Sequence, residues 1–149
     1  QPVLSVERTP TPQEIESPIN WSFISFSFGL WSKSPFNDKL LKDTKNNIVK
    51  VDKNGKESIL DYELVDYKDN LSLVKINLKT GRSHQIRVQF SSRNHALYGD
   101  NKYNKSAKVG EQIALFAKSL ELIHPTTKEV MKFSLELKNK YPWNIFNIK

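Results

Sequence analysis

The chain has 149 residues, of which 38% are hydrophobic and 26% are charged, a balance typical of one soluble globular domain rather than a disordered chain. It contains no cysteine, which excludes a disulfide framework and a thiolate metal site. Its three histidines lie far apart in sequence, so no metal is expected. The formal net charge of +7 favours a polyanionic partner such as nucleic acid, although a basic protein without such a partner is the alternative.

No stretch of the chain approaches the roughly 20 apolar residues that span a bilayer. The most apolar run, residues 21–31, is short and interrupted by serines. The N-terminus lacks a basic region followed by an apolar core, so no signal peptide is expected. We therefore expect a cytoplasmic protein with no membrane partner. Because the chain starts with Gln rather than Met, a fragment or a processed product is expected.

The N-terminal segment, residues 1–18, carries four of the seven prolines, which favours extended chain. Residues 21–31 then alternate aromatic residues with serines, as a half-buried strand does. Trp21 and Phe23 share one parity of this strand. Aromatic side chains beside a basic surface could stack on bases, but packing in a core or edge strand is the interpretation that we favour.

A lysine-rich segment follows at residues 33–56, where seven lysines face three aspartates and give a local charge of +4. Residues 46–47 and 54–55 are turn signals, and residues 48–51 form a short strand at best. The segment predicts a surface ribbon that meets an RNA backbone. A solvated loop with no partner is the alternative. The candidate RNA-binding residues here are Lys42, Lys45, Lys50 and Lys53.

Two β-hairpins are predicted from period-two alternation of apolar and polar residues. In the first, residues 60–64 and 74–78 flank a turn at 67–70. In the second, residues 113–124 and 129–137 flank a turn at 125–128. The dry face of the second hairpin is expected to comprise Met131, Phe133, Leu135 and Leu137.

Residues 141–146 are expected to fold back as a short closing turn or helix. The fold class predicted from these elements is α+β, with an antiparallel or mixed sheet and a few short helices.

The first hairpin leads into residues 79–87, which read Lys-Thr-Gly-Arg-Ser-His-Gln-Ile-Arg. Gly81 suits a sharp turn, and a helix is predicted at about residues 83–92, with Ile86 and Phe90 on one face. Arg82 and Arg87 lie five positions apart, so they project in different directions. One could hold a phosphate while the other points into a pocket. An ordinary helix with two solvated arginines is the alternative.

Residues 78–88 resemble the "TGR-(S/T)-HQ-(I/L)-R" signature of the RluA-type (large-subunit rRNA) pseudouridine synthase family. Residues 98–103 resemble the "GD-x-x-Y" element of that family. Residues 113–126 resemble its "LHA…L-x-F-x-HP" hairpin, with Phe116 where His is usual. Parts of the lysine-rich segment resemble its "LLKD…N-x-V" and "GK" elements. The resemblance covers roughly residues 37–143.

The resemblance implies that residues 36–149 are the C-terminal part of a pseudouridine synthase catalytic domain. Residues 1–35 form an extended or poorly matched N-terminal segment, because the family has there a strand resembling "Y-x-A-x-V-x-G". The family isomerises uridine to pseudouridine in structured RNA, such as rRNA or tRNA, without a metal or organic cofactor. Its target base must be flipped out of the RNA.

In the family, the catalytic aspartate lies in a motif resembling "H-R-L-D-x-x-T-S-G", and this motif is absent here. None of the seven aspartates follows Arg-Leu. The chain is therefore expected to be a fragment that is inactive alone. A non-catalytic basic RNA-binding module is the alternative, and a purely structural or assembly protein is a third possibility. The identity of the RNA and the oligomeric state stay open.

The resemblance also assigns roles to individual positions. Arg87 matches the arginine that pairs with the catalytic aspartate, and Ile86 matches the apolar neighbour that packs against the base. Arg82 and His84 match positions expected to contact phosphate and to support the turn, with a helix cap and a surface histidine as the alternatives. Tyr103 is expected to pack in a loop.

The family's active-site tyrosine is assigned to no residue. We expect Arg87 to point into a pocket on the concave face of the sheet, with Arg82 nearer the surface. Because the catalytic aspartate is missing, Arg87 is expected to find its partner in an anion, a backbone carbonyl or an acidic residue of a neighbouring chain.

Overall fold

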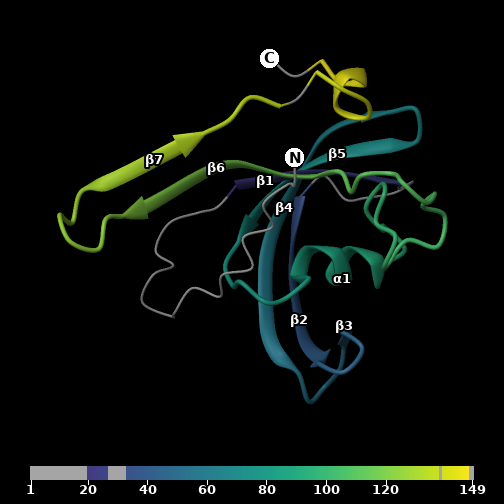
Figure 1. Cartoon of the computed structure of the whole chain (residues 1–149), viewed down its shortest axis with the longest axis horizontal. Coiled ribbons are helices and arrows are strands. Elements are labelled where there is room, and N and C mark those ends of the chain that lie inside the picture. Colours follow the sequence, from purple (N-terminus) through teal and green to yellow (C-terminus); the bar gives the residue numbers. More distant parts are fainter. Residues whose placement is uncertain (1–19, 27–32, 138, 148–149) are drawn as a thin grey trace.

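The structure is a computed structural model that describes the backbone of residues 20–26, 33–137 and 139–147, and the side chains of residues 35–137 and 139–147. Its described strands form one seven-stranded sheet in the order β3-β2-β4-β5-β1-β6-β7, and every neighbouring pair is antiparallel (Figure 1). With the short helix α1, this confirms the α+β class. The strands are β1 (Asn20–Phe26), β2 (Lys33–Asp43), β3 (Ile48–Val51), β4 (Lys56–Lys68), β5 (Leu71–Leu78), β6 (Leu115–Ile123) and β7 (Val130–Ser134).

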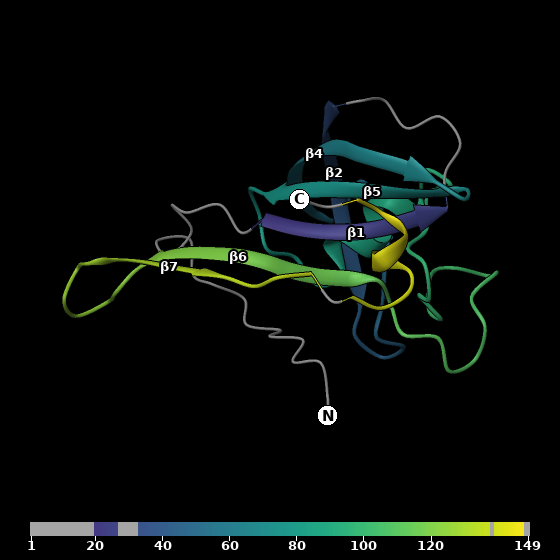
Figure 2. The same ribbon diagram turned by 90° about the horizontal axis from the view of Figure 1, so that it is seen from above.

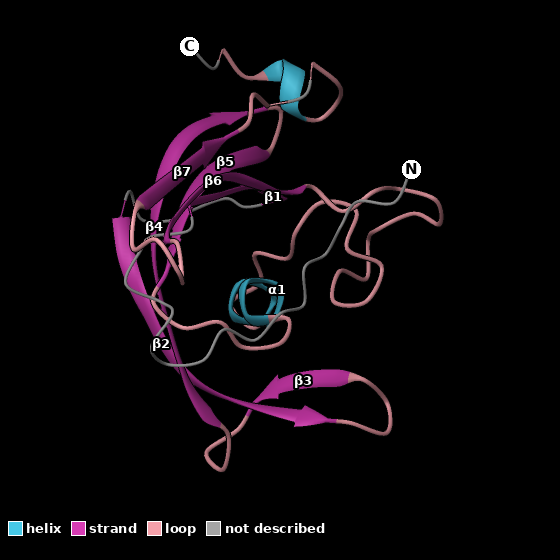
Figure 3. Ribbon diagram, turned by 60° about the vertical axis from the view of Figure 1, so that its left-hand side comes forward, coloured by secondary structure: helices cyan, strands magenta, loops and turns pink. Residues whose placement is uncertain are grey.

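Helix α1 (Gln85–Ser91) lies on the concave side of the curved sheet, as Figure 3 shows. The register between β4 and β5 shifts between Leu64 and Asp66, and such a bulge increases the bend and twist of a sheet. The helix buries its apolar side chains against the sheet, where Phe90 makes edge-on aromatic contacts with Phe36 and Tyr62, and the Phe36 and Tyr62 rings meet at a tilt. The main core comprises Phe36, Leu60, Tyr62, Val74, Ile76, Ile86, Phe90 and Leu97.

The first predicted hairpin is confirmed as β4 and β5, paired antiparallel. Its two-residue loop consists of Asp69 and Asn70, whose φ angles of 51° and 61° are both positive. Two successive residues with positive φ are the mark of a type I′ turn, whose twist matches that of the flanking strands. Asp and Asn tolerate this conformation better than other non-glycine residues, which explains the choice of residues at the turn.

The lysine-rich segment is more regular than a surface ribbon, because β2 and β3 form an antiparallel hairpin at the edge of the sheet. After β3, the chain passes so close to β2 that a Cβ atom on Gly55 would lie 2.4 Å from the carbonyl carbon of Leu40. Only glycine fits this approach without a shift of the backbone. The Asn-Gly turn signal at residues 54–55 therefore also has a packing reason.

The β1 strand lies between β5 and β6, so it is an interior strand of the sheet and not an edge strand. Its presence at residues 20–26 agrees with the strand predicted from aromatic alternation. The prediction that Trp21 and Phe23 share a buried face concerns side chains outside the described residues, as does the extended segment predicted at residues 1–18.

The second predicted hairpin is confirmed as β6 and β7, but its predicted dry face is wrong in part. Phe133 and Leu135 are 49% and 61% exposed, whereas Met131 and Leu137 are half-buried. The hairpin projects beyond the body of the described chain, and β7 is the edge strand at the end of the sheet opposite β3 (Figures 1 and 2). Alternation along a strand predicts which side chains share a face, but it cannot predict that another element covers that face.

The predicted closing turn is confirmed as a short 3-10 helix, η1 (Trp143–Ile145). Trp143 and Phe146 pack in a second core with Leu71, Leu73 and Ala114. This contact holds the C-terminal segment against the start of β5. Within the described ranges, neither helix has the length and apolar character needed to cross a membrane.

Candidate functional site

The turn between β5 and α1 is held by a buried amide, the side chain of Gln85. Its Oε1 accepts hydrogen bonds from Thr80 Oγ1 (2.9 Å) and from the Arg82 backbone N–H (3.0 Å). Its Nε2 donates to the Ile59 carbonyl of β4 at 3.1 Å. A buried amide must be satisfied in this way to avoid a large desolvation cost. Sequence pattern did not predict this role of Gln85, although the residue lies within the motif.

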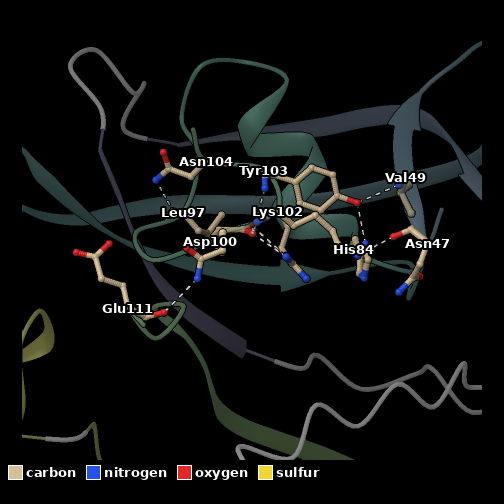
Figure 4. A network of polar contacts seen from close by, with 11 residues as sticks. Asn47, Val49, His84, Leu97, Asp100, Lys102, Tyr103, Asn104 and Glu111 are labelled. Carbon is tan, nitrogen blue, oxygen red and sulfur yellow. Dashed lines mark hydrogen bonds and ion pairs between the residues drawn. The ribbon is translucent and has the colours of Figure 1, made fainter. Parts of the chain in front are cut away.

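The start of α1 is set by His84, which has a left-handed backbone with a φ of 52°. The helix therefore begins at Gln85 rather than at the predicted Ser83. The His84 side chain turns toward the loop after α1, where Nδ1 lies 2.7 Å from Tyr103 Oη (Figure 4). His84 thus links the two motif segments, residues 79–87 and 98–103.

Arg87 forms a bidentate ion pair with Asp100 of its own chain. Nε donates to Oδ2 at 2.9 Å, and Nη2 donates to Oδ1 at 2.6 Å. The Asp100 side chain is fully buried and that of Arg87 is 23% exposed. The expectation that Arg87 pairs with an anion, a backbone carbonyl or an acidic residue of a neighbouring chain is therefore wrong, because its partner is an aspartate of its own chain. The sequence shows Asp100 only as part of the Gly-Asp element, because its partner lies 13 positions away and no local pattern connects them.

Tyr103 packs its ring beneath the Arg87 guanidinium, with 5.0 Å from Cζ to the ring centroid. Its hydroxyl oxygen accepts a hydrogen bond from the Val49 backbone N–H of β3 at 2.9 Å (Figure 4). Burial raises the pKa of the Tyr103 hydroxyl, so the group is protonated at neutral pH. Since its oxygen accepts from Val49, its proton can be donated to His84 Nδ1. Tyr103 thus connects α1, the loop after it and the β2–β3 hairpin.

Arg82 is exposed, as predicted, and its Nε donates to the Glu57 carbonyl at 3.0 Å. Ile86 is buried in the main core, on the face of α1 that contacts the sheet. The two arginines of the motif therefore differ as expected, since Arg82 lies at the surface and Arg87 is partly buried.

The four candidate lysines of the β2–β3 hairpin are all exposed, but they do not share one face. Lys42 lies opposite Val49, a residue that packs against Val88 of α1, so Lys42 is on the face toward the helix. Lys50 has the opposite parity and forms an ion pair with Asp52 at 3.1 Å. Lys45 and Lys53 lie in the turns before and after β3.

Lys102 is a basic residue that sequence pattern did not single out. It follows the buried Asp100, and its Nζ donates to the Asn47 carbonyl in the β2–β3 turn at 2.8 Å. Lys102 and Lys42 both lie on the α1 side of the hairpin, so the structure brings positive charge from two distant segments toward Arg87. Lys102 belongs to no charge run, which explains why its place near the motif is visible only in the fold.

A second arginine on this side of the sheet, Arg93, was also missed. Its Nη1 and Nη2 donate to Asp38 of β2 at 2.9 and 3.0 Å, and its Cζ lies 4.0 Å from the centroid of the Phe36 ring. Gln89 Nε2 also donates to Asp38 at 2.8 Å. Burial alone would raise the pKa of Asp38, but the hydrogen bonds from Arg93 and Gln89, together with the Arg93 charge, hold it below its ordinary value.

The sequence of the chain matches that of one known protein family. A sequence model described as "RNA pseudouridylate synthase" matches residues 10–92, which is more than half of the chain. The match includes β1 to β5 and α1, and with them the turn that carries Arg82 and Arg87. The chain belongs to the RNA pseudouridylate synthase family.

Individual relatives agree with this membership. The chain is similar to an uncharacterized RNA pseudouridine synthase of Synechocystis sp., at 39% identity over 90 residues, or 58% of this chain and 28% of that protein. It is also similar to ribosomal large subunit pseudouridine synthase D of Blochmanniella floridana, at 36% identity over 62% of this chain and 34% of that protein. Synthase C of Vibrio parahaemolyticus is 28% identical over 84% of this chain and 42% of its own length. The chain thus spans less than half the length of these relatives.

Solved structures support the fold. Human RNA pseudouridylate synthase domain containing 1 superposes with a TM-score of 0.68 at 20% identity, over 80% of this chain and 54% of that one. Human RNA pseudouridylate synthase domain containing 4 gives a TM-score of 0.63 at 16% identity, over 83% and 59%. The described sheet and helix therefore form part of a pseudouridine-synthase-like fold.

Proposed function

We propose that this chain is the arginine-bearing part of an RNA pseudouridine synthase, which isomerises uridine to pseudouridine once an aspartate is supplied by a further segment. The observation that carries the proposal is the partly buried Arg87 in the family motif, held by Asp100 and stacked on Tyr103. Its guanidinium keeps donors beyond those that Asp100 uses, and a guanidinium fork suits a second carboxylate.

The chemistry needs a carboxylate that this chain does not offer in the family's context. No aspartate follows Arg-Leu. Asp100 is fully buried and hydrogen-bonded, and Asp38 is committed to Arg93 and Gln89. A nucleophile must reach the substrate, and these two carboxylates are engaged in holding the fold. The 149-residue chain is therefore proposed to be inactive alone.

RNA contact is proposed for the face that carries Arg87. Lys42 and Lys102 lie on that side, and the turns at Lys45 and Lys53 extend the positive charge along the hairpin. Arg82 and His84 are proposed to contact phosphate and to support the turn. rRNA or tRNA is the proposed substrate class, and the cytoplasm is the proposed location.

The test compares the 149-residue chain with a longer protein encoded by the complete reading frame. Each is incubated with rRNA tritiated at uridine C5, from which pseudouridine formation releases tritium. We expect no release above a boiled control from the short chain. The longer protein should release tritium, and changing the aspartate of its Arg-Leu-Asp motif to Asn should abolish the release.

Two outcomes would contradict the proposal. Turnover by the short chain would point to a carboxylate within its own 149 residues. A complete reading frame without an Arg-Leu-Asp motif, whose product binds RNA without releasing tritium, would favour the second candidate, a non-catalytic RNA-binding module. The absence of that motif from this chain is the observation that favours this candidate.

A further inference from the structure

Asp100 is a fully buried carboxylate whose contacts divide between its two oxygens. Oδ1 accepts hydrogen bonds from Arg87 Nη2 (2.6 Å) and from the backbone N–H groups of Lys102 (3.0 Å) and Tyr103 (3.2 Å). Oδ2 accepts from Arg87 Nε at 2.9 Å. Oδ1 therefore braces the turn at residues 100–103 and also accepts from the guanidinium, whereas Oδ2 contacts the guanidinium alone.

Asp100 holds the Arg87 guanidinium by one edge only. Arginine has five N–H donors in a fixed plane, and Asp100 engages Nε and Nη2. Of the residues that the structure describes, none accepts a hydrogen bond from Nη1 of Arg87. A side-on contact of this kind fixes the plane of the guanidinium and leaves its end, formed by Nη1 and the second proton of Nη2, for another acceptor.

The face of the guanidinium is held by the same turn. The Tyr103 ring lies beneath Arg87, and Asp100 accepts the Tyr103 backbone N–H. The hydroxyl of that ring is in turn fixed by Val49 and His84. Asp100 therefore sets the edge of the guanidinium directly and its face through Tyr103, so both contacts that orient Arg87 depend on one carboxylate.

We propose that Asp100 is a positioning residue for the isomerisation: it holds Arg87 side-on, so that the Nη1 end of the guanidinium is presented to the aspartate that a further segment supplies. The inference rests on the proposed function and adds a residue to it. A carboxylate that only braced the turn would need Oδ1 alone. The Oδ2 contact with Nε has no effect on the turn and acts only on Arg87.

The asymmetry between the two oxygens defines the test. Asp100→Asn can keep Oδ1 with its two backbone contacts and its contact with Nη2, but it places an amide N–H₂ against Nε–H, so the side-on contact loses its Nε half and the carboxylate charge. We expect the full-length protein with Asp100→Asn to fold and to bind RNA within about twofold of the unchanged protein. Its kcat for tritium release should fall roughly 10- to 100-fold with KM unchanged, since displaced supporting groups typically cost that much.

The matched control is Asp38→Asn, the same chemical change in the ion pair of Arg93. It should lower stability and leave kcat within about twofold. Arg87→Lys, alone and combined with Asp100→Asn, tests whether Asp100 acts through Arg87, because the two losses in kcat should then fall well short of multiplying. Should Asp100→Asn not fold, Asp100→Glu keeps the charge and shifts the carboxylate, and it should lower kcat in the same way.

A folded Asp100→Asn or Asp100→Glu protein with kcat within twofold of the unchanged protein overturns the inference. Losses in kcat that multiply with those of Arg87→Lys also overturn it, because Asp100 would then act independently of Arg87. If the unchanged full-length protein releases no tritium, the proposed function fails and the inference falls with it.

Discussion

Two bidentate arginine–aspartate pairs lie at α1, and they differ in geometry: Arg93 meets Asp38 end-on through Nη1 and Nη2, whereas Arg87 meets Asp100 side-on through Nε and Nη2. Arg93 donates to Asp38, to the Gln89 carbonyl at 2.9 Å and, more weakly, to Ser92 Oγ at 3.4 Å. Its charge is used within the fold, between β2 and the end of the helix. Arg87 meets Asp100 by one edge and Tyr103 by one face, and it keeps donor capacity at its end.

The difference teaches that burial and pairing do not separate an arginine that holds the fold together from one that is proposed to act on a partner. The Arg93 pair is slightly more exposed than the Arg87 pair, at 33% and 13% against 23% and 0% for the arginine and aspartate side chains. What distinguishes the two is how many donors have acceptors inside the described fold. An arginine whose donors are mostly used stabilises the fold, and one with donors remaining at its end can act on a partner.

The largest expected effect is on stability at the Arg93 pair. Arg93→Ala removes the bidentate contact, the stacking on Phe36 and a bond to the helix end, so we expect a loss of about 2 to 3 kcal/mol in the free energy of unfolding, below the range for fully buried pairs. Urea denaturation measures this loss. Lys79→Ala, which breaks the exposed pair with Asp61, is the control and should cost about 0.5 kcal/mol or less. Equal losses would show that the Arg93 pair is no more than a surface contact.

A smaller effect is expected on RNA binding. Loss of the Arg93 pair should leave RNA binding unchanged. Changing the hairpin set of Lys42, Lys45, Lys50 and Lys53 to Gln should flatten the plot of log K against log salt by roughly 0.7 per lost phosphate contact. A control set of four exposed lysines outside the hairpin removes the same charge: Lys68, Lys75, Lys128 and Lys140. If both variants give the same slope, the RNA-binding surface does not lie on the Arg87 side of the sheet.

The smallest expected effect is a change in the pKa of His95, which is sensitive to the charge of Arg93. Burial lowers its pKa, and the Arg93 charge lowers it further. NMR titration should therefore show the pKa of His95 rising in Arg93→Gln and falling in Asp38→Asn, which removes the charge that offsets Arg93. Shifts of the same sign in both variants would contradict the role of Arg93.

The lowered pKa of His95 also determines whether stability rises or falls with pH. A histidine with a lowered folded pKa binds a proton more readily in the unfolded chain. The free energy of unfolding should therefore fall as pH drops below about 6.5, the ordinary value, and level off below the folded pKa. His95→Gln should remove this slope, as urea denaturation between about pH 5 and 7 would measure.

Local pattern predicted much of the fold. Alternation identified both hairpins, and the four-residue spacing of Ile86 and Phe90 identified the helix and its buried face. These features depend on residues close in sequence. The prediction for Phe133 and Leu135 was wrong because exposure depends on which elements cover a strand, which alternation does not encode.

The site was predicted less completely, because its contacts are distant in sequence. The motif identified Arg87, but Asp100 and Val49 are brought to it by the tertiary fold. The division of the lysines between two faces requires the β2–β3 register, since a shift of one residue would place Lys42 and Lys50 on the same face. Buried amides such as Gln85 are similarly invisible, because their partners include backbone groups of other strands.

The hydrogen bond of the Tyr103 hydroxyl also affects the edge of the sheet formed by β3. Strand β3 is an edge strand, and unpaired backbone groups on such a strand invite another chain to add to the sheet and aggregate. The Tyr103 hydroxyl occupies the Val49 N–H, and Lys102 occupies the neighbouring Asn47 carbonyl. The turn that orients Arg87 therefore also occupies one backbone group of β3 and one in the preceding turn, so a change that loosens Tyr103 would free the Val49 N–H for another chain as well as release Arg87.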